Sequence, residues 1–140
     1  MTTRLTVTIP GPLPRELSPN ASWKVPGGMK ARLKREMAEL WHYSALNTLW
    51  HLLGLDTYAT TTQALFPNGP VRCQITYYRP KGGKEWDKDN LLATCKFGLD
   101  ALQRVGVVSN DRQLDYQPVK QDRDPVGVGY LVVELEGEAT

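Results

Sequence analysis

The sequence predicts an α/β (α+β) fold: a single domain with a mixed β-sheet and two main helices. Residues 28–53 and 88–105 each carry apolar side chains at steps of three and four, which is typical of helices with one buried face. Shorter segments rich in β-branched residues come before, between and after these two. The 140 residues have the length of one domain (1–140), which needs no disulfide or structural metal to fold. We therefore expect the order β-α-β-α-β-β.

The first part of the chain predicts one strand and one long helix. Residues 4–9 alternate and contain β-branched side chains, as a half-buried strand does. Prolines and a glycine then interrupt regular structure up to about residue 27. The first helix should cover residues 28–53 and end at Gly54. Its apolar stripe consists of Leu33, Met37, Leu40, Trp41, Ala45, Leu49 and Leu52.

The middle of the chain predicts a second strand and a second helix. Residues 55–70 have the composition of a polar loop, and residues 71–78 that of a strand. A flexible basic loop follows over residues 79–84. The second helix should cover residues 88–105, with Gly106 as its C-terminal cap. Its apolar stripe consists of Leu92, Cys95, Leu99 and Leu102, with Phe97 and Ala101 beside it.

The C-terminal part predicts two more strands, over residues 113–120 and 129–135. The turn-rich stretch 122–125 separates them. Together with the strands at 4–9 and 71–78, they supply the expected mixed sheet.

Charge is distributed unevenly along the chain, although the formal net charge is only +2. Residues 1–56 contain seven Lys or Arg against four Asp or Glu, whereas residues 121–140 contain one Arg against five acids. This asymmetry predicts a basic face and an acidic C-terminal end. A basic face suits a polyanionic partner such as a nucleic acid.

Three features argue against the secreted and membrane classes. No apolar run approaches the ~20 residues that span a bilayer, and the N-terminus lacks the apolar core of a signal peptide. Cys73 and Cys95 stand far apart, without the spacing of metal ligands. We expect both cysteines to be reduced and the protein to be cytoplasmic, with no membrane partner.

The strongest functional signal is a group of three carboxylates within twenty-five residues. Asp87 and Asp89 stand at the start of the second predicted helix, and Asp111 follows that helix in a turn. Mg²⁺ prefers oxygen ligands, and it usually takes one or two protein carboxylates together with water and phosphate oxygens. Lys96, on the helix between them, would add a positive charge for a phosphate. The pattern therefore predicts Mg²⁺-dependent chemistry on a phosphodiester.

A purely structural interpretation of the same residues stays open. Asp is a favoured helix N-cap, Asn-Asp is a common turn, and a lysine on a helix is often only solvated. In the functional interpretation, Asp87 and Asp89 share one face of an extended entry segment. Lys96 then lies about 10 Å along the helix from Asp89, near the same stripe, since each residue rises ~1.5 Å.

Further short motifs extend this pattern along most of the chain, most densely in residues 85–120. They are Asp87-x-Asp89-Asn90, Lys96, Asp100-Ala101-Leu102, Gly106-Val107-Val108, Asn110-Asp111, Gln113, Asp115-Tyr116 and Val119-Lys120, with Pro14 and Leu17-Ser18-Pro19-Asn20 near the N-terminus. In this combination the chain resembles the RusA-type Holliday-junction endonucleases. The resemblance implies a small Mg²⁺-dependent homodimer of mixed α/β fold that cuts four-way DNA junctions, as in bacteria and their phages.

The resemblance also implies roles for individual residues. Asp87, Asp89 and Asp111 correspond to the metal-binding and catalytic carboxylates, and Lys96 corresponds to the catalytic lysine. Asn90 corresponds to the neighbour that orients the site. Mn²⁺ is expected to substitute for Mg²⁺. In the best-known members the lysine stands three residues closer to the Asp-Asn pair, but three residues are close to one helical turn, which keeps Lys96 on about the same face.

Basic and aromatic residues near the acids are candidates for contacts with DNA. The basic loop and the start of the second helix would reach phosphates, and such contacts weaken with salt. A second cluster lies at the start of the first helix and is equally consistent with a solvated helix face. The tryptophan beside the acids is expected to contact DNA as a stacking surface or a wedge. The complete set is Arg79, Lys81, Lys84, Lys88, Lys30, Arg32, Trp86 and Asn90.

The resulting expectation is a Mg²⁺-dependent endodeoxyribonuclease that resolves Holliday junctions by paired symmetric nicks in DNA recombination and repair. One chain carries one such site, so we expect a homodimer whose two-fold symmetry matches that of the junction. Three alternatives stay open. They are a nuclease that prefers flaps or forks, a catalytically inactive protein that binds branched DNA, and an unrelated α/β interaction domain.

Overall fold

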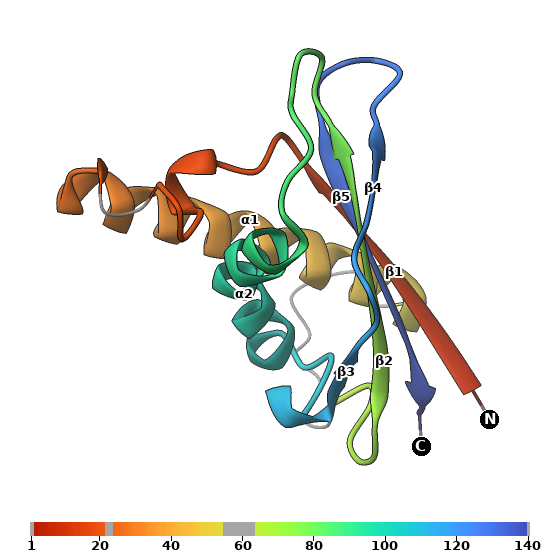
Figure 1. The fold of residues 1–140 in the computed structure, drawn as a ribbon. Coiled ribbons are helices and arrows are strands. Elements are labelled where there is room, and N and C mark those ends of the chain that lie inside the picture. Colours follow the sequence, from red (N-terminus) through yellow and green to blue (C-terminus); the bar gives the residue numbers. More distant parts are fainter. Residues whose placement is uncertain (1, 22–23, 55–63, 140) are drawn as a thin grey trace.

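Two helices cover one face of a five-stranded mixed sheet (Figure 1). The computed structural model describes residues 2–21, 24–54 and 64–139. The predicted α/β (α+β) class is confirmed, and no helix within these ranges is long and apolar enough to cross a membrane. In chain order the elements are β1 (Thr2–Pro10), η1 (Arg15–Leu17), α1 (Gly27–Leu53), β2 (Val71–Arg79), α2 (Lys88–Arg104), η3 (Asp111–Gln113), β3 (Leu114–Tyr116), β4 (Lys120–Arg123) and β5 (Tyr130–Glu138).

Both helices lie within one residue of their predicted bounds. α1 ends where Gly54 adopts the left-handed conformation, with φ 70°. At the end of α2, the Gly106 N–H donates to the Gln103 carbonyl and the Val107 N–H to the Leu102 carbonyl. This is the Schellman arrangement, which satisfies two carbonyls that the helix leaves free. Of the loop predicted at 55–70, residues 55–63 lie outside the described part.

The single strand predicted over residues 113–120 is wrong. This stretch contains β3 and, after a break, the first residue of β4. Pro118 lies in the break because proline has no N–H for a sheet ladder, and its carbonyl accepts a bond from the Gln74 side chain (2.8 Å). β4 also continues through Arg123, which we had expected in a turn, because it pairs in parallel with Thr76–Arg79 of β2.

β2 is the centre of the sheet, because it pairs with strands on both sides. The order is β1-β5-β2-β3, and β4 pairs with the later part of β2. β5 is antiparallel to both β1 and β2, whereas β3 and β4 are parallel to β2. β5 runs to Glu138, beyond its predicted end, because β1 pairs with it along its whole length. Alternate residues of the three long strands are buried under the helices, and the residues between them form an open face.

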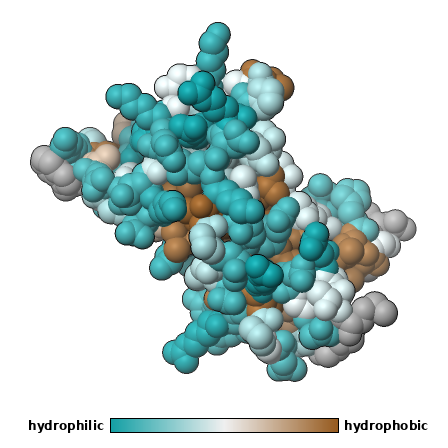
Figure 2. Space-filling model, turned by 45° about the vertical axis from the view of Figure 1, so that its right-hand side comes forward, coloured by the Kyte–Doolittle hydropathy of each residue, from teal (hydrophilic) through white to brown (hydrophobic). Residues whose placement is uncertain are grey.

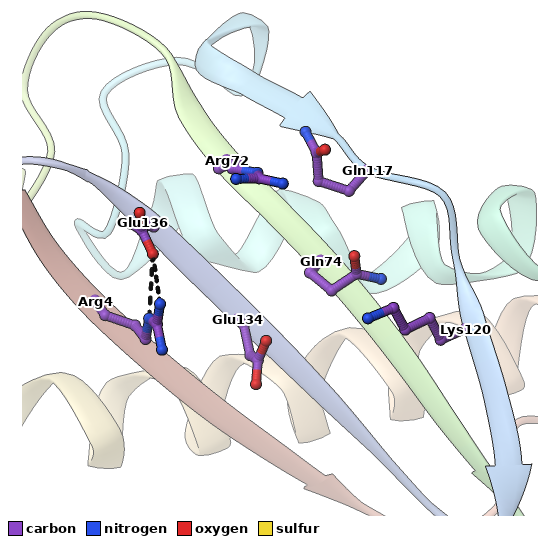
Figure 3. Close-up of a pocket in the computed structure, with 7 residues that line it drawn as sticks. All are labelled: Arg4, Arg72, Gln74, Gln117, Lys120, Glu134 and Glu136. Atoms are coloured by element: carbon purple, nitrogen blue, oxygen red, sulfur yellow. Dashed lines mark hydrogen bonds and ion pairs between the residues drawn. The ribbon is translucent and has the colours of Figure 1, made fainter.

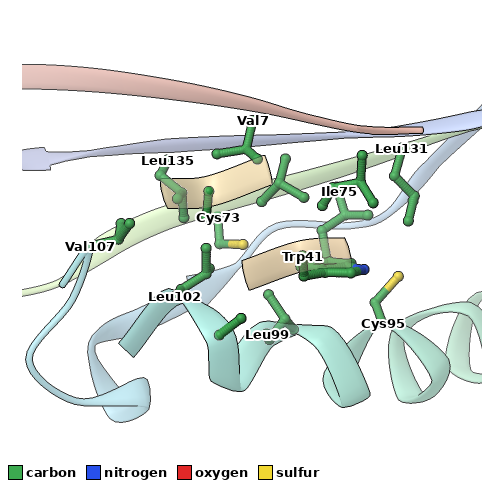
Figure 4. Packing of buried hydrophobic residues seen from close by; sticks show 14 of the residues in the cluster. Val7, Trp41, Cys73, Ile75, Cys95, Leu99, Leu102, Val107, Leu131 and Leu135 are labelled. Carbon is green, nitrogen blue, oxygen red and sulfur yellow. The ribbon is translucent and has the colours of Figure 1, made fainter. Parts of the chain in front are cut away.

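Trp41 of α1 lies where the two helices cross. Its indole is 1% exposed and lies against Gly98 of α2, at the place where a Cβ would be. Figure 4 shows Trp41 between α2 and the sheet, close to the buried side chains of both. The missing side chain at Gly98 therefore lets α2 approach α1 closely, and the rest of the core is packed around this contact.

Cys73 of β2 and Cys95 of α2 are free and buried in the same core. Burial raises the pKa of the Cys73 thiol to about 12. Burial, with a smaller contribution from Cys73, also raises the pKa of Cys95. Neither side chain forms a thiolate near neutral pH, so both act as small apolar core residues.

A hydrogen-bonded loop over residues 124–129 joins β4 to β5. The buried Asp124 carboxylate accepts backbone N–H bonds from Val126 (2.9 Å), Val128 (3.0 Å) and Gly129 (2.8 Å). These bonds, led by the one from Gly129, lower the pKa of Asp124, and desolvation opposes them. The conformation of the loop therefore depends on a charged carboxylate.

We predict that Gly98→Ala destabilises the protein by about 2 kcal/mol, because the added methyl group overlaps the Trp41 ring and overpacks the core. The free energy of unfolding in urea measures this. Gly28→Ala is the matched control, because Gly28 also lies in a helix and has open space where the methyl group would go. If Gly98→Ala has the same free energy of unfolding as the parent chain, the two helices can move apart without a loss of stability.

We predict that Asp124→Asn is less stable than the parent chain at neutral pH. Because the folded-state pKa of Asp124 lies below its ordinary 3.8, the stabilisation is fully present above that value and is lost as pH falls through the folded-state pKa. Urea unfolding between pH 7 and pH 2 should therefore show the two proteins converging at the acid end. Asp100→Asn, at an exposed carboxylate of α2, is the control. A difference in unfolding free energy between the two proteins that stays constant from pH 7 to pH 2 would contradict the prediction.

Candidate functional site

Two predicted acids stand at the N-terminus of α2. Asp87 is the N-cap, and its Oδ1 accepts the backbone N–H of Asp89 (2.9 Å) and of Asn90 (3.3 Å). Asp89 lies in the first turn, and both carboxylates belong to exposed residues. Asp87 therefore caps the helix, as its residue type predicts. The capping bonds use only Oδ1, and the positive end of the helix dipole favours both charges here.

The segment that leads into α2 is held by the side chain of Gln121 from β4. Its Oε1 accepts the Trp86 N–H and its Nε2 donates to the Trp86 carbonyl, each at 2.8 Å. These two bonds replace the sheet ladder that this irregular segment lacks. They fix the residue immediately before Asp87, and so fix where the acidic pair begins.

The wedge or stacking role predicted for Trp86 is not supported. Its side chain belongs to the buried core and is only 5% exposed. One edge meets Tyr77 in a T-shaped contact (6.2 Å between centroids), and the Arg15 guanidinium covers the ring at 4.8 Å. Arg15 also donates a hydrogen bond to the Lys84 carbonyl. With both partners in place the ring has almost no surface left for a base, and Trp86 instead anchors the entry to α2.

Lys96 and two acids surround a tyrosine. The Lys96 ammonium lies 6.0 Å from the centre of the Tyr116 ring, within reach of a cation–π contact. Burial is the main cause that raises the pKa of the Tyr116 hydroxyl, and the charges of Asp111 and Asp100 add to it. Tyr116 therefore lies within electrostatic range of both acids, a position that its place in a short strand did not predict.

Asp111 is positioned by the side chain of Gln113. The Gln113 Oε1 accepts the N–H groups of Ser109 (2.8 Å) and Asn110 (2.9 Å), while its Nε2 donates to the carbonyls of Phe66 (2.9 Å) and Gly69 (3.1 Å). The Asn110 side chain in turn accepts the Arg112 N–H (2.9 Å). η3 is thus tied to a distant segment of the chain, and the exposed Asp111 at its start has a defined place.

The three predicted metal ligands come from two elements. Asp87 and Asp89 lie at the N-terminus of α2, whereas Asp111 starts η3, which follows the helix. Among residues 2–21, 24–54 and 64–139, no three His, Cys, Asp or Glu side chains are grouped closely enough to hold an ion. That Asp87, Asp89 and Asp111 bind one metal together stays a prediction. Asn90 follows them in the first turn and is half-buried.

The predicted basic residues fall into two groups. Lys81, Lys84 and Lys88 are exposed between the end of β2 and the start of α2, near the acidic pair in sequence. Arg79 is half-buried, and its Nε donates to the Asp122 carbonyl (3.4 Å). In α1, the exposed Arg32 forms an ion pair with Glu36 (3.7 Å), which matches the alternative of a solvated helix face. Lys30 is half-buried in the first turn of that helix.

The open face of the sheet carries a polar hollow of about 220 Å³ that we did not predict (Figure 3). An ion pair between Arg4 and Glu136 (2.8 Å) crosses from β1 to β5 at one side of it. Side chains from four separate segments line the hollow, so no local sequence pattern predicts it. Its lining is Arg4, Arg72, Gln74, Gln117, Lys120, Glu134 and Glu136.

Comparisons with protein-family models and with curated proteins find no match to this chain.

We predict that Asp87→Ala destabilises the protein by about 1 kcal/mol, because alanine cannot accept the two N-terminal N–H bonds of α2. Asp87→Asn is the matched variant, because asparagine caps as well as aspartate. The urea concentration at which half of this variant is unfolded should be nearly that of the parent chain, although the variant lacks the negative charge. Equal losses in both variants would show that the charge, not the cap, provides the stability.

Proposed function

We propose that this chain is a Mg²⁺-dependent endodeoxyribonuclease that cuts branched DNA, with four-way junctions as its substrate and paired nicks as its product. The observation that carries the proposal is the arrangement along α2. Two exposed carboxylates stand at its positive end, and Lys96 lies over Tyr116 further along it, within electrostatic range of Asp111. The resemblance of these same residues to the RusA-type endonucleases supports this substrate.

The donor set fits Mg²⁺, or Mn²⁺ in its place. Asp87, Asp89 and Asp111 are exposed oxygen donors, and Mg²⁺ needs only one or two carboxylates when phosphate and water complete its shell. No His or Cys stands among them to favour a softer metal. When bound, Mg²⁺ would lower the pKa of a water molecule and stabilise the leaving oxygen of the cut strand.

The chain's own residues would hold and neutralise the phosphate. Lys96, on the exposed side of α2, would offset the charge that grows on the phosphoryl oxygens in the transition state. Lys81, Lys84 and Lys88 would hold the neighbouring phosphates and so position the strand. The Tyr116 ring would orient Lys96, because its face attracts the ammonium.

Two cuts in one junction need two sites, and we propose a homodimer in which each chain supplies one. A two-fold symmetric dimer matches the symmetry of a four-way junction. Recombination and repair intermediates of this shape form on the DNA of a bacterium or of a phage that infects it, so the place of action would be the bacterial cytoplasm.

The test is incubation of the purified chain with a synthetic four-way junction, in Mg²⁺ and in EDTA, followed by a denaturing gel. We expect paired nicks at symmetric positions only with Mg²⁺. Linear duplex, a flap and a replication fork of matched sequence are the substrate controls. Cutting of the flap or fork in preference to the junction would favour the related nuclease instead, and uncut but retarded junction would favour the binding protein.

We predict that Asp89→Asn lowers the rate of junction cutting at least 100-fold, the scale of losing one group that stabilises transition-state charge. Junction binding and the midpoint of urea unfolding should be unchanged. Glu39→Gln is the control, because it removes one exposed carboxylate on α1. If Asp89→Asn cuts the junction as fast as the parent chain does, Asp89 has no part in the mechanism. If the variant loses both its fold and its junction binding, the role of Asp89 is structural.

A further inference from the structure

The loop over residues 124–129 presents two apolar side chains to solvent. Val126 is 83% exposed and Val128 is 60% exposed, and Val126 is the most exposed large apolar residue in the described part of the chain. In Figure 1 this loop is the blue turn at the upper end of the molecule, and Figure 2 shows a brown apolar patch at the same end. The rest of the fold does not need these side chains, because neither is part of the core.

The loop holds the two valines in one conformation. Asp124 accepts the N–H groups of Val126, Val128 and Gly129, so the carboxylate lies inside the turn. The Gly127 N–H donates to the Asp124 carbonyl (3.0 Å), and the Asp124 N–H donates to the Arg79 carbonyl (2.9 Å). A loop with this many internal bonds loses little conformational entropy when it binds a partner.

The neighbouring basic loop over residues 79–84 lies beside the 124–129 loop. The Lys81 N–H donates to the Gly127 carbonyl (2.9 Å), which places the two loops side by side. Lys81 of that loop and Arg123, which precedes Asp124, are both exposed. The exposed acids nearby are Asp122 and Glu85, while the charge of Asp124 is turned inward. An apolar tip edged by cations matches DNA, whose stacked bases are apolar and whose backbone is anionic.

We propose that the 124–129 loop is a wedge that inserts Val126 and Val128 between base pairs at the branch point of a DNA junction, while Lys81 and Arg123 contact the flanking phosphates. This inference rests on the proposed function, because both require branched DNA. Apolar wedges are a known way for proteins to unstack and bend a duplex. A branch point is already partly unstacked, which lowers the cost of insertion there.

The wedge would also place the cut. Asp87 is the sixth residue after Lys81, and six residues of extended chain span at most about 20 Å. At ~3.4 Å of rise per base pair, this is about six base pairs. With Lys81 on a phosphate beside the branch, the acids at the start of α2 therefore reach phosphates within about six base pairs of that contact.

The experiment uses a four-way junction with 2-aminopurine at the branch, in EDTA to prevent cutting. This base fluoresces more strongly when it is unstacked. The parent chain should raise the fluorescence, and Val126→Ser/Val128→Ser should not. The double variant should also lose about tenfold in junction affinity, the size of effect that burying an apolar side chain supplies, and keep the parent affinity for linear duplex. Both positions are exposed, so the fold should be unaffected, as urea unfolding checks.

Tyr43→Ser is the matched control, because Tyr43 is 67% exposed on α1, outside both loops. It should behave as the parent chain.

The wedge is wrong, and the nuclease proposal stands, if the double variant binds the junction and raises the fluorescence as the parent does. The same conclusion follows if the parent cuts the junction in Mg²⁺ but does not change the fluorescence in EDTA. If the double variant shifts the balance of monomer and dimer in gel filtration, the tip is a contact between copies and the wedge is again wrong. If the parent binds no branched DNA, both proposals fail.

Discussion

The contact between Trp41 and Gly98 is the constraint on which the rest of this structure depends. The indole lies where a side chain of α2 would be, so only glycine allows the two helices to cross at this distance. α2 carries Asp89 and Lys96 and leads directly into the turn that ends at Asp111. The position of nearly every candidate catalytic group therefore follows from one close approach in the core, well away from solvent.

Two glutamine side chains then fix the irregular segments at either end of α2. Gln121 satisfies both backbone groups of Trp86 before the helix, and Gln113 satisfies two N–H groups and two carbonyls after it. Backbone N–H and carbonyl groups near the core need hydrogen-bond partners, and in segments without regular structure side chains supply them. In the described residues every buried side-chain nitrogen or oxygen has a partner. The exposed acids are thus held on a rigid frame, although they lie at the surface.

Carboxylates have two opposite uses in this protein. Asp124 is buried and turned inward, and backbone N–H groups satisfy its charge, so it acts as a structural anchor for a loop. Asp87 and Asp89 are exposed at the end of a helix whose dipole favours negative charge. The first arrangement only stabilises a conformation, whereas the second caps a helix through Asp87 and also leaves charge available to a partner. The same chemical group can be assigned to one use or the other only from what surrounds it.

The fold class, both helices and the residues that end them could be predicted from the sequence, because periodicity, glycine and proline act locally. The sequence also indicated which acids and which lysine are candidates. Only tertiary contacts cover Trp86 with Arg15 and Tyr77, divide one predicted strand into two at Pro118, and place Lys96 over Tyr116. These outcomes depend on contacts between segments far apart in the chain, and a local pattern carries no information about which distant side chain will cover a ring or complete a hydrogen bond.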